Sequence, residues 1–458
     1  MIKWNLDELA RLTEGAMQAG NAAFTSISTD TRSLQPGALF VALSGPNFDG
    51  HEFVAAAAER GAAAALVERP MPGSLPQVVV TDALIALSAF AKAWRRQFDI
   101  PVIGVTGSNG KTTTKELIGS ILARLGPCLI TRGNLNNHIG VPLMLLEMTA
   151  AHRFAVIEMG ANHQREIAHL ASLAEPSIGI VTNAGAAHLE GFGSLDGVAN
   201  GKGEMFRGLP EDGVAIVNVD DAYAQQWLDT RVAKKVYTFG IDRPADFTAQ
   251  RIHESGDTGD FRIDFDLLTP AGTKPASIGL AGLHNLRNAL GAAATTFAAG
   301  ASLDDIVAGL AAMRKVSGRL EFKPALHDAF LVDDSYNANP SSLKAGLDAF
   351  RNFSGERWLV LGEMRELGEG GDELHAEVGR YARQTGVSRV LAVGAGSRFA
   401  VDAFGANAQW FADLDALIAT AAADLRPGIA ILIKGSRANR LERVSAALAA
   451  QPATGNGH

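Results

Sequence analysis

The sequence predicts an α/β protein with three domains, and three observations support this fold class. The chain has 458 residues, and at roughly 150 residues per domain this length favours three domains that each bury a core. Short apolar runs alternate with helical segments over most of the chain, which is typical of parallel sheets with crossover helices. The run at 102–107 continues into a glycine-rich turn and a helix that begins with Lys111, an order typical of phosphate-binding domains.

Residues 1–82 are predicted to form a small N-terminal α/β domain. Its expected elements are a helix near 6–18, a strand at 38–43, an alanine-rich helix at 52–60, and strands at 64–68 and 77–82. The central domain, a P-loop ATPase domain with a parallel sheet, is predicted to span 83–314. Its expected elements are a helix at 83–98, strands at 102–107, 154–160, 177–183 and 213–218, an antiparallel stretch at 236–280, and a helix at 284–300.

The C-terminal domain, 315–458, is predicted to be a Rossmann-like α/β domain. Its expected strands lie at 329–336, 357–364, 389–396 and 428–436 and are separated by helices. The tail "QPATGNGH", residues 451–458, is expected to be disordered because it is small, polar and terminal.

Composition excludes several classes of protein. The net charge of −8, without a long run of like charge, argues against general affinity for nucleic acid or a membrane surface. Cys128 is the only cysteine, so no intramolecular disulfide can form, which fits a reducing compartment. The first residues do not resemble a signal peptide, and no stretch approaches the roughly 18 apolar residues of a membrane span. We therefore expect a cytoplasmic protein.

The stretch "VTGSNGKTTTKE", from Val105 to Glu116, is the main candidate for a ligand site. Gly107 and Gly110 allow the backbone to approach a phosphate closely, and the start of the following helix offers N–H donors and a partial positive charge. Lys111 can reach the outer phosphates, and the Thr112 hydroxyl can bind Mg²⁺. Val105 departs from the usual G-x-x-x-x-G-K-T pattern. The alternative is an ordinary strand-to-helix turn with an exposed lysine.

Two further residues are candidates because the carboxyl ends of parallel strands share one edge of a sheet, and a third, Lys202, stands among small residues. Glu158 ends the strand "FAVIE" and suits Mg²⁺ by its oxygen ligands, unless it is a solvated acid. His188, in "TNAGAAHLEGFG", follows the next strand, although a lone histidine can also be structural. Lys202, in "ANGKGEMF", stands near the start of a helical segment and could equally be a surface lysine.

Several stretches together resemble the Mur ligases, the ATP-dependent amide-forming enzymes of peptidoglycan precursor synthesis. Beside the loop and the segments around Glu158, His188 and Lys202, they are "TDTRSLQPGALFVALSGPNFDGHEF" (29–53), "GNLNNHIGVP" (133–142), "GLHNLRNALGAAA" (282–294), "DDSYNANPSS" (333–342), "LGEMRELG" (361–368) and "IKGSRANRLE" (433–442). The sequence T-G-S-N-G-K-T is this family's own variant of the phosphate loop, which accounts for valine at position 105.

Within the family, "DDSYNANP" followed by "LGEMRELG" is similar to members that add D-alanyl-D-alanine to UDP-N-acetylmuramoyl-tripeptide. The resemblance thus implies an ATP-dependent ligase that forms an acyl phosphate in cell-wall synthesis, with ATP and Mg²⁺ as cofactors and these two small molecules as substrates. It implies no nucleic-acid or membrane partner, and we expect a monomer. The meso-diaminopimelate-adding member is disfavoured because its Asp-Asn-Pro-Arg motif is absent from the C-terminal third.

The resemblance also implies roles for individual residues. The ATP phosphates would be held by Gly107, Ser108, Asn109, Gly110, Lys111, Thr112 and Thr113, and the rest of the nucleotide site would include Asn285, Asn288, Arg319 and Asp334. Mg²⁺ would be bound by Thr112, Glu158, His188 and Lys202, with Lys202 as a carbamate. Lys111, His188 and Lys202 would be the catalytic residues. The sugar nucleotide would contact Ser28, Thr29, Asp30, Arg32, Asn134 and Asn137.

Some alternatives stay open at this point. Asn337 and Asn339 can be turn residues before a helix with Pro340 near its start, or contacts to the dipeptide or ATP. Folylpolyglutamate synthases share the central loop, but are not expected to carry the N-terminal "DGHEF" segment. A P-loop switch without a bond-forming reaction is a further possibility. The fragment "VGAGS" (393–397) weakly suggests a dinucleotide oxidoreductase, because it lacks the complete G-x-G-x-x-G pattern.

Overall fold

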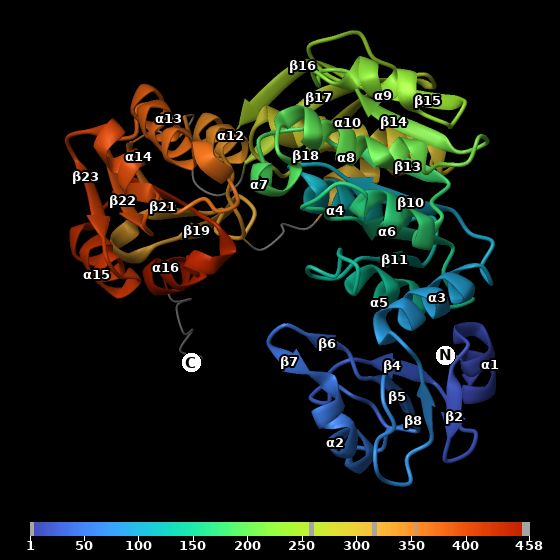
Figure 1. Cartoon of the computed structure of the whole chain (residues 1–458). Coiled ribbons are helices and arrows are strands. Elements are labelled where there is room, and N and C mark those ends of the chain that lie inside the picture. Colours follow the sequence, from blue (N-terminus) through green and yellow to red (C-terminus); the bar gives the residue numbers. More distant parts are fainter. Residues whose placement is uncertain (1–3, 256–260, 314–317, 352, 354, 451–458) are drawn as a thin grey trace, which may run out of the picture. The chain divides into compact units, whose positions relative to one another are not determined.

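The structure, a computed structural model, describes residues 4–255, 261–313, 318–351, 353 and 355–450 (Figure 1). The chain divides into two compact units. The first comprises Met1–Gly104, Gly126–Gly160 and Ala168–Ser177, and the second Val105–Leu125, Ala161–Ile167 and Ile178–His458. The domain boundary expected at 314/315 and the tail at 451–458 lie outside the described residues.

The first unit contains a five-stranded N-terminal sheet. Its order is β2 (Ala16–Gln18), β9 (Gln77–Val79), β8 (Ala64–Val67), β5 (Ala38–Val41) and β4 (Ser26–Ser28). Strand β2 pairs antiparallel to β9, and the other strands are parallel. Helix α2 (Val54–Glu59) packs on one face of this sheet, where Val54 and Ala57 join the apolar cluster around Phe40. The unit also contains the short pairs β1 (Trp4–Asn5) with β3 (Ala23–Phe24) and β6 (Ser44–Gly45) with β7 (Phe48–Asp49).

The helix predicted at 6–18 is shorter than expected. Helix α1 (Leu6–Thr13) ends at Glu14, which adopts the left-handed conformation with φ of 53°. Residues 16–18 then form strand β2 instead of a last helical turn. The left-handed residue closes the helix because its backbone N–H turns back to Ala10 O.

The central sheet has six strands in the order β11 (Cys128–Ile130), β12 (Phe154–Glu158), β10 (Val102–Thr106), β13 (Ile178–Val181), β14 (Val214–Asn218) and β15 (Lys235–Phe239). The two units divide within β10. Every residue of β10, β12, β13 and β14 is buried, which explains their uninterrupted apolar runs. The helices of this region are α3 (Ala83–Arg95), α4 (Lys111–Leu122), α5 (Gly140–Leu146), α6 (Glu166–Ala174), α7 (Leu189–Phe192), α8 (Leu195–Arg207), α9 (Ala224–Thr230), α10 (Leu283–Ala298) and α11 (Leu303–Ala312).

The antiparallel stretch predicted at 236–280 is confirmed in its larger part. Strands β16 (Thr248–Ser255), β17 (Arg262–Thr269) and β18 (Gly272–Ile278) form a three-stranded antiparallel sheet. The prediction was wrong for 236–239, because β15 pairs in parallel with β14 at the edge of the central sheet. As an edge strand, β15 is mostly half-buried or exposed, so its sequence lacks the continuous apolar run of the other parallel strands.

The C-terminal sheet has the order β19 (Glu321–Pro324), β20 (Phe330–Asp333), β24 (Ile429–Lys434), β21 (Glu356–Gly362), β22 (Arg389–Val393) and β23 (Ala408–Phe411). Only β19 is antiparallel to its neighbour within this sheet. Alternate residues of each strand face opposite sides. Helices α12 (Pro340–Phe350), α13 (Gly371–Gln384) and α14 (Ser397–Phe404) cover one face, and α15 (Leu414–Asp424) and α16 (Glu442–Leu448) the other (Figure 1). This layering confirms the predicted α/β class.

Among the described residues, no helix combines the length and apolarity that a membrane crossing requires.

Candidate active site

The phosphate loop joins β10 to α4, and its two glycines are required by close neighbours. Gly107 has φ of +144°, and a Cβ there would lie 1.9 Å from Thr182 Oγ1. Gly110 has φ of +77°, and a Cβ would lie 2.3 Å from Asn288 Oδ1. Val105 is buried in β10, so the turn starts two residues later, at Gly107. The loop therefore needs glycine at 107 and 110 but not at 105.

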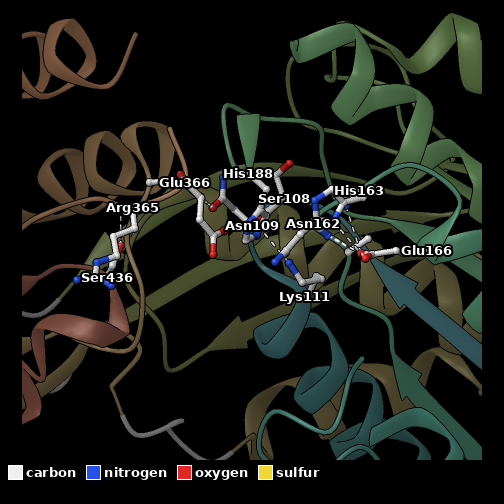
Figure 2. Close-up of polar contacts among 12 residues, drawn as sticks. Ser108, Asn109, Lys111, Asn162, His163, Glu166, His188, Arg365, Glu366 and Ser436 are labelled. Carbon is white, nitrogen blue, oxygen red and sulfur yellow. Dashed lines mark hydrogen bonds and ion pairs between the residues drawn. The ribbon is translucent and has the colours of Figure 1, made fainter. Parts of the chain in front are cut away.

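The loop is fixed by hydrogen bonds to the segment after β13. Asn109 N donates to Asn183 Oδ1 (3.0 Å), and Asn109 O accepts from Thr182 Oγ1 (2.6 Å). Ser108 Oγ donates to Gly185 O (3.1 Å). Lys111 Nζ donates to Gly107 O (2.6 Å), so its ammonium lies over the loop (Figure 2). These hydrogen bonds fix the backbone of the loop, and they place the lysine at the start of α4, where N–H groups can bind an anion.

A cavity of about 300 Å³ in the second unit brings together eight of the residues expected to bind ATP. They are Asn109, Gly110, Thr112, Thr113, Asn285, Asn288, Arg319 and Asp334. Asn285 and Asn288 lie on consecutive turns of α10, and Asn288 Nδ2 donates to Asn285 Oδ1 (3.2 Å). Asp334 pairs with the buried Lys434. The structure therefore places residues that are distant in the sequence in one pocket.

A second cavity, of about 370 Å³, shares Asn109, Gly110 and Thr112 with the first. It is lined by Ser108, Asn109, Gly110, Lys111, Thr112, Ala187, His188, Arg319, Tyr336, Asn337, Ala338, Asn339, Ser342, Arg365, Glu366, Ser436, Arg437 and Ala438. We call it the loop cavity. It combines the lysine of the phosphate loop with His188 and with loops that follow three strands of the C-terminal sheet. This arrangement can hold a phosphoryl group and an attacking molecule in the same space.

His188 is paired with a residue that the sequence did not single out. It occupies the left-handed conformation (φ 54°) at the start of α7, and its Nδ1 contacts a carboxylate oxygen of Glu366 (Figure 2). The hydrogen bond to His188 holds the pKa of Glu366 below its ordinary value, although burial opposes this. Glu190 N also donates to Glu366 O (3.3 Å). The segment around His188 is thereby connected to the "LGEMRELG" segment.

Lys202 lies in the middle of α8, not near its start as the sequence suggested, and is almost fully buried. Its Nζ donates to Ala161 O (2.9 Å) and lies 4.9 Å from the centre of the Phe192 ring. Burial, together with the nearby Lys111 ammonium, holds the pKa of Lys202 well below its ordinary value, while Glu166 and Glu204 oppose this. The amine is therefore neutral more readily than a surface lysine, which is the form that can take up carbon dioxide.

Glu158 lies in the first unit and ends β12, as expected. Its side chain is buried, and Oε1 accepts from Asn136 Nδ2 (2.8 Å). Asn136 belongs to the segment in which Asn134 and Asn137 were the expected substrate contacts. Asn134 is exposed, and Asn137 Oδ1 accepts from Gly140 N (2.8 Å) at the start of α5. The hydrogen bond of Asn136 orients the carboxylate at the carboxyl end of its strand.

The first unit contains a separate cavity of about 520 Å³, lined by Thr25, Ser26, Ile27, Ser28, Thr29, Asp30, Ser33, Arg132, Leu135, Leu143, Leu146, Glu147, Met148 and Thr149. It includes three of the four residues expected at the uridine diphosphate. The fourth, Arg32, is exposed and pairs with Asp30 through three side-chain contacts, two at 3.0 Å and one at 2.6 Å. The hydrogen bonds from Arg32 lower the pKa of Asp30 to about 2.

For Asn339 the structure confirms the first of the two alternatives, a turn residue directly before a helix, and contact to the dipeptide or ATP stays a prediction. Asn339 caps α12, because its Oδ1 accepts from Ser342 N (2.8 Å) ahead of Pro340. It also contacts the phosphate loop, because its Nδ2 donates to Asn109 Oδ1 (2.7 Å). Asn337 O accepts from Lys434 Nζ (3.1 Å). A single side chain thus fixes the start of α12 and the conformation of the loop.

Comparison with known proteins decides which family these features represent. Residues 23–95 match the Mur ligase family catalytic domain, 105–296 the Mur ligase middle domain, and 318–437 the Mur ligase glutamate ligase domain. The UDP-N-acetylmuramoyl-tripeptide–D-alanyl-D-alanine ligase of Escherichia coli K12 is 44% identical over 451 residues, which are 98% of this chain and 99% of that protein.

The chain belongs to the Mur ligase family.

Other Mur ligases match over a similar length. The enzyme of the same name from Haemophilus influenzae is 37% identical, over 97% of this chain and 98% of its own. A crystal structure of MurF from Acinetobacter baumannii superposes with a TM-score of 0.89 at 36% identity, covering 97% of this chain and 98% of that one. MurF from Thermotoga maritima, in complex with ADP, gives a TM-score of 0.81 at 27% identity, with 92% and 96% covered. These matches confirm the predicted three-domain Mur ligase fold.

A folylpolyglutamate synthase from Mycobacterium tuberculosis shares the fold alone, at 18% identity and a TM-score of 0.64.

Sequence reasoning missed several residues of this Mur ligase that contact the expected site. Asn136 lies next to Asn137, and Glu366 lies within the quoted segment 361–368, but their partners, Glu158 and His188, are 22 and 178 positions away in the chain. Lys434 pairs with Asp334 across 100 positions. A buried lysine in an otherwise apolar strand, "IAILIK", was the signal that could have revealed Lys434.

Proposed function

We propose that this chain is an ATP-dependent ligase that joins D-alanyl-D-alanine to UDP-N-acetylmuramoyl-tripeptide in peptidoglycan synthesis. The observation that carries the proposal is the loop cavity, in which the phosphate loop and the "DDSYNANP" and "LGEMRELG" segments line one space. The likeness to curated ligases of this name extends over nearly the whole chain, at 44% identity for the enzyme of Escherichia coli. An amide-forming, ADP-releasing reaction is the activity that follows.

The chemistry requires activation of a carboxylate. An amine does not displace oxide from a carboxylate at neutral pH, so the γ-phosphoryl group of ATP is first transferred to the carboxylate of the tripeptide. The resulting acyl phosphate has a good leaving group. The amine of D-alanyl-D-alanine then attacks the carbonyl carbon, and the tetrahedral intermediate collapses to amide and inorganic phosphate.

The first step brings two anions together, and Lys111 opposes the resulting repulsion. At 4 Å, each pair of unit charges repels by about 1 kcal/mol in water and about 4 kcal/mol at an effective dielectric of 20. The Lys111 ammonium lies over the loop carbonyls of Gly107 and Ser108, at 2.6 and 3.3 Å. From there it can stabilise the charge on the transferring phosphoryl group.

Magnesium is part of this proposal, and the oxygen donors among its expected ligands suit it. Thr112, Glu158, His188 and Lys202 would hold it. Glu158 offers a buried carboxylate, and Lys202 becomes an oxygen donor once its amine, with a pKa lowered by burial, is carbamylated. Hard oxygen donors are the ligands that Mg²⁺ prefers. When bound, the ion would neutralise part of the charge on the phosphates.

We also propose where the sugar nucleotide and the nucleoside of ATP bind. The cavity around Ser28, Thr29 and Asp30 would receive the uridine diphosphate end of the substrate, with Arg32 at its margin and Asn134 and Asn137 near the muramoyl part. The cavity around Asn285 and Asn288 would receive the nucleoside of ATP, with Arg319 and Asp334. We further propose that the enzyme is a cytoplasmic monomer of three domains, 1–82, 83–314 and 315–458.

The direct test is ADP release by the purified protein with each acceptor in turn. We expect release to require both UDP-N-acetylmuramoyl-tripeptide and D-alanyl-D-alanine, and mass spectrometry to show the pentapeptide product. D-alanine and L-amino acids should not replace the dipeptide. Full activity with those acceptors and none with D-alanyl-D-alanine would overturn the assigned substrate. ADP release without either substrate would instead favour a P-loop switch.

A further inference from the structure

The segment 161–166, which leads into α6, has no role in the reaction as described so far. It belongs to the second unit, together with the helix α8 that carries Lys202. Lys202 Nζ donates to the carbonyl oxygen of Ala161 (2.9 Å), and both residues are buried. The place of this carbonyl therefore determines where the Lys202 nitrogen is held, together with any group that is built on it.

Two further contacts fasten the segment to α8. Arg165 N donates to Glu204 Oε1 (2.7 Å), and Gln164 Nε2 donates to Gly197 O (2.7 Å). Glu204 is 7% exposed, so its carboxylate is shielded from water where it accepts this N–H. Arg165 has a φ of 69°, a left-handed conformation that is uncommon for residues other than glycine. The hydrogen bond to Glu204 stabilises the backbone at this unfavourable position.

The segment also closes on itself. Glu166 Oε2 accepts from Asn162 N (2.7 Å) and from His163 N (3.2 Å) (Figure 2). Helix α7 packs closely against it, because a Cβ at Gly191 would lie 2.1 Å from Asn162 O. The backbone that follows Ala161 is therefore fixed by its own turn and by two neighbouring helices.

Carbamylation would change the hydrogens on the Lys202 nitrogen. The lone pair of the neutral amine attacks carbon dioxide, a carbon–nitrogen bond forms, the electron pair of one C=O bond moves to its oxygen, and one N–H proton leaves to solvent. The carbamate keeps one N–H, which can retain the hydrogen bond to Ala161 O. A carbamate is planar by the same resonance as a peptide bond, so a fixed N–H also fixes the plane of its two oxygens.

The Phe192 ring restricts the direction of these oxygens further. Lys202 Nζ lies 4.9 Å from the centre of this buried ring. The face of an aromatic ring carries partial negative charge, so it attracts a cation and repels an anion. The carbamate oxygens would therefore point away from the ring while the N–H points to Ala161 O. Together the two contacts favour one orientation of the group.

We infer that Glu204 is a positioning residue, which holds the segment 161–166 so that the Ala161 carbonyl binds and orients the carbamate of Lys202. The inference rests on the proposed function, because it requires the carbamate. It gives Glu204 no contact with ATP or with either substrate. Loss of the bond between Glu204 and Arg165 should therefore weaken carbamylation, and should lower activity only as a consequence.

The test measures carbamylation directly, by ¹³C NMR of the full chain over a series of ¹³C-bicarbonate concentrations. Glu204→Ala removes the acceptor for Arg165 N, so we expect the bicarbonate concentration that gives half of the maximal carbamate signal to rise about tenfold. ADP release by this variant should be low in air and should recover at saturating bicarbonate. Glu204→Gln keeps an oxygen acceptor, and its half-maximal concentration should stay within about threefold of the wild-type value.

A second variant tests the same anchoring without altering the buried carboxylate. Gln164 is exposed, so Gln164→Ala should fold normally while it loses the contact to Gly197 O. We expect its half-maximal bicarbonate concentration to rise by about twofold to threefold, as for the loss of a neutral hydrogen bond.

Glu68→Ala is the matched control, because Glu68 Oε1 also accepts one backbone N–H, that of Ala83 (3.0 Å), but in the first unit. It should respond to bicarbonate like the wild type, and thermal unfolding should show all four variants folded. Wild-type bicarbonate dependence in both Glu204→Ala and Gln164→Ala would overturn the inference, and so would a loss of activity in Glu204→Ala that saturating bicarbonate does not restore. A wild-type protein without any carbamate signal would instead contradict the carbamate in the proposed function.

Discussion

Asn339 Nδ2 donates a hydrogen bond of 2.7 Å to Asn109 Oδ1, which joins the start of α12 to the phosphate loop. Asn109 Nδ2 in turn donates to Ser341 Oγ (2.8 Å), one residue beyond Pro340. The loop that would bind ATP is therefore held from two sides, by the segment after β13 and by the first turn of α12. Asn339 therefore both caps α12 and contacts the phosphate loop.

Two substitutions of Asn339 separate these roles. Asn339→Asp keeps the capping acceptor for Ser342 N but loses the donor to Asn109, so we expect nearly unchanged stability and a KM for ATP raised severalfold. Asn339→Ala loses both interactions, and its free energy of unfolding should fall by about 1 kcal/mol in addition. Urea unfolding and ADP-release kinetics measure the two effects. If the aspartate variant has the KM of the wild type, the contact to Asn109 is not needed for ATP binding.

Gly107→Ala should abolish ATP binding because its Cβ would lie 1.9 Å from Thr182 Oγ1, so that the loop must move away from β13. The matched control is Gly272→Ala. Gly272 has a similar φ of +124°, but no atom lies within 4 Å of a Cβ built there. Both variants carry the backbone strain of a non-glycine residue, of the order of 1–3 kcal/mol. Only Gly107→Ala should lose ATP binding by calorimetry. Equal ATP affinity in the two variants would argue against the packing of this loop.

Lys202 should carry a carbamate in the working enzyme. We expect ¹³C NMR of the protein in ¹³C-bicarbonate to show a carbamate signal that is absent from Lys202→Met. Activity of the wild type should fall when carbon dioxide is removed and recover when it is restored. The physical reason is the buried amine, whose pKa is lowered by burial and by Lys111. A spectrum without this signal at saturating bicarbonate would leave Lys202 as a buried structural lysine.

We expect Asp333 to make the free energy of unfolding depend on pH in the acidic range. Burial raises the pKa of this carboxyl, but hydrogen bonds from Ser335 (2.6 Å), Ser445 (2.6 Å) and Lys323 (2.9 Å) outweigh it and lower the pKa below its ordinary value. The stabilisation is therefore present above about pH 4 and is lost as the pH falls through the folded-state pKa. Ser445→Ala should cost about 2 kcal/mol at pH 7.

The difference in unfolding free energy between this variant and the wild type should shrink at lower pH, because protonation of Asp333 removes the charge that strengthens the bond. Urea unfolding at pH 7 and pH 3 measures it. A difference that is the same at both values would show that Ser445 contributes by packing and not through the carboxylate.

The sequence was sufficient to predict those features whose physical cause lies in neighbouring residues of the chain. The strand, turn and lysine from Val102 to Lys111 follow from local chemistry, and Glu158 was correctly placed at the end of its strand because the apolar run ends there. The place of Asn339 directly before a helix was one of the two predicted alternatives, since Pro340 follows it. In each case the physical cause lies within a few positions of the residue concerned.

Features that depend on distant contacts were not predicted. The pairing of His188 with Glu366 joins residues 178 positions apart, and neither local sequence has a pattern that indicates the other. Strand β15 was assigned to the antiparallel stretch because its alternating pattern reflects an edge position, which only the assembled sheet defines. The end of α1 depends on the left-handed conformation of Glu14, a residue that rarely adopts it.

The transfer of a phosphoryl group to the substrate acid is the central claim, and an isotope experiment tests it most directly. UDP-N-acetylmuramoyl-tripeptide would be labelled with ¹⁸O in the carboxylate that is joined, and the inorganic phosphate released during ligation would be analysed by mass spectrometry. Collapse of an acyl phosphate leaves the bridging oxygen on phosphorus, so we predict one ¹⁸O atom in phosphate for each amide formed. Phosphate without ¹⁸O, released while the amide forms, would contradict this account.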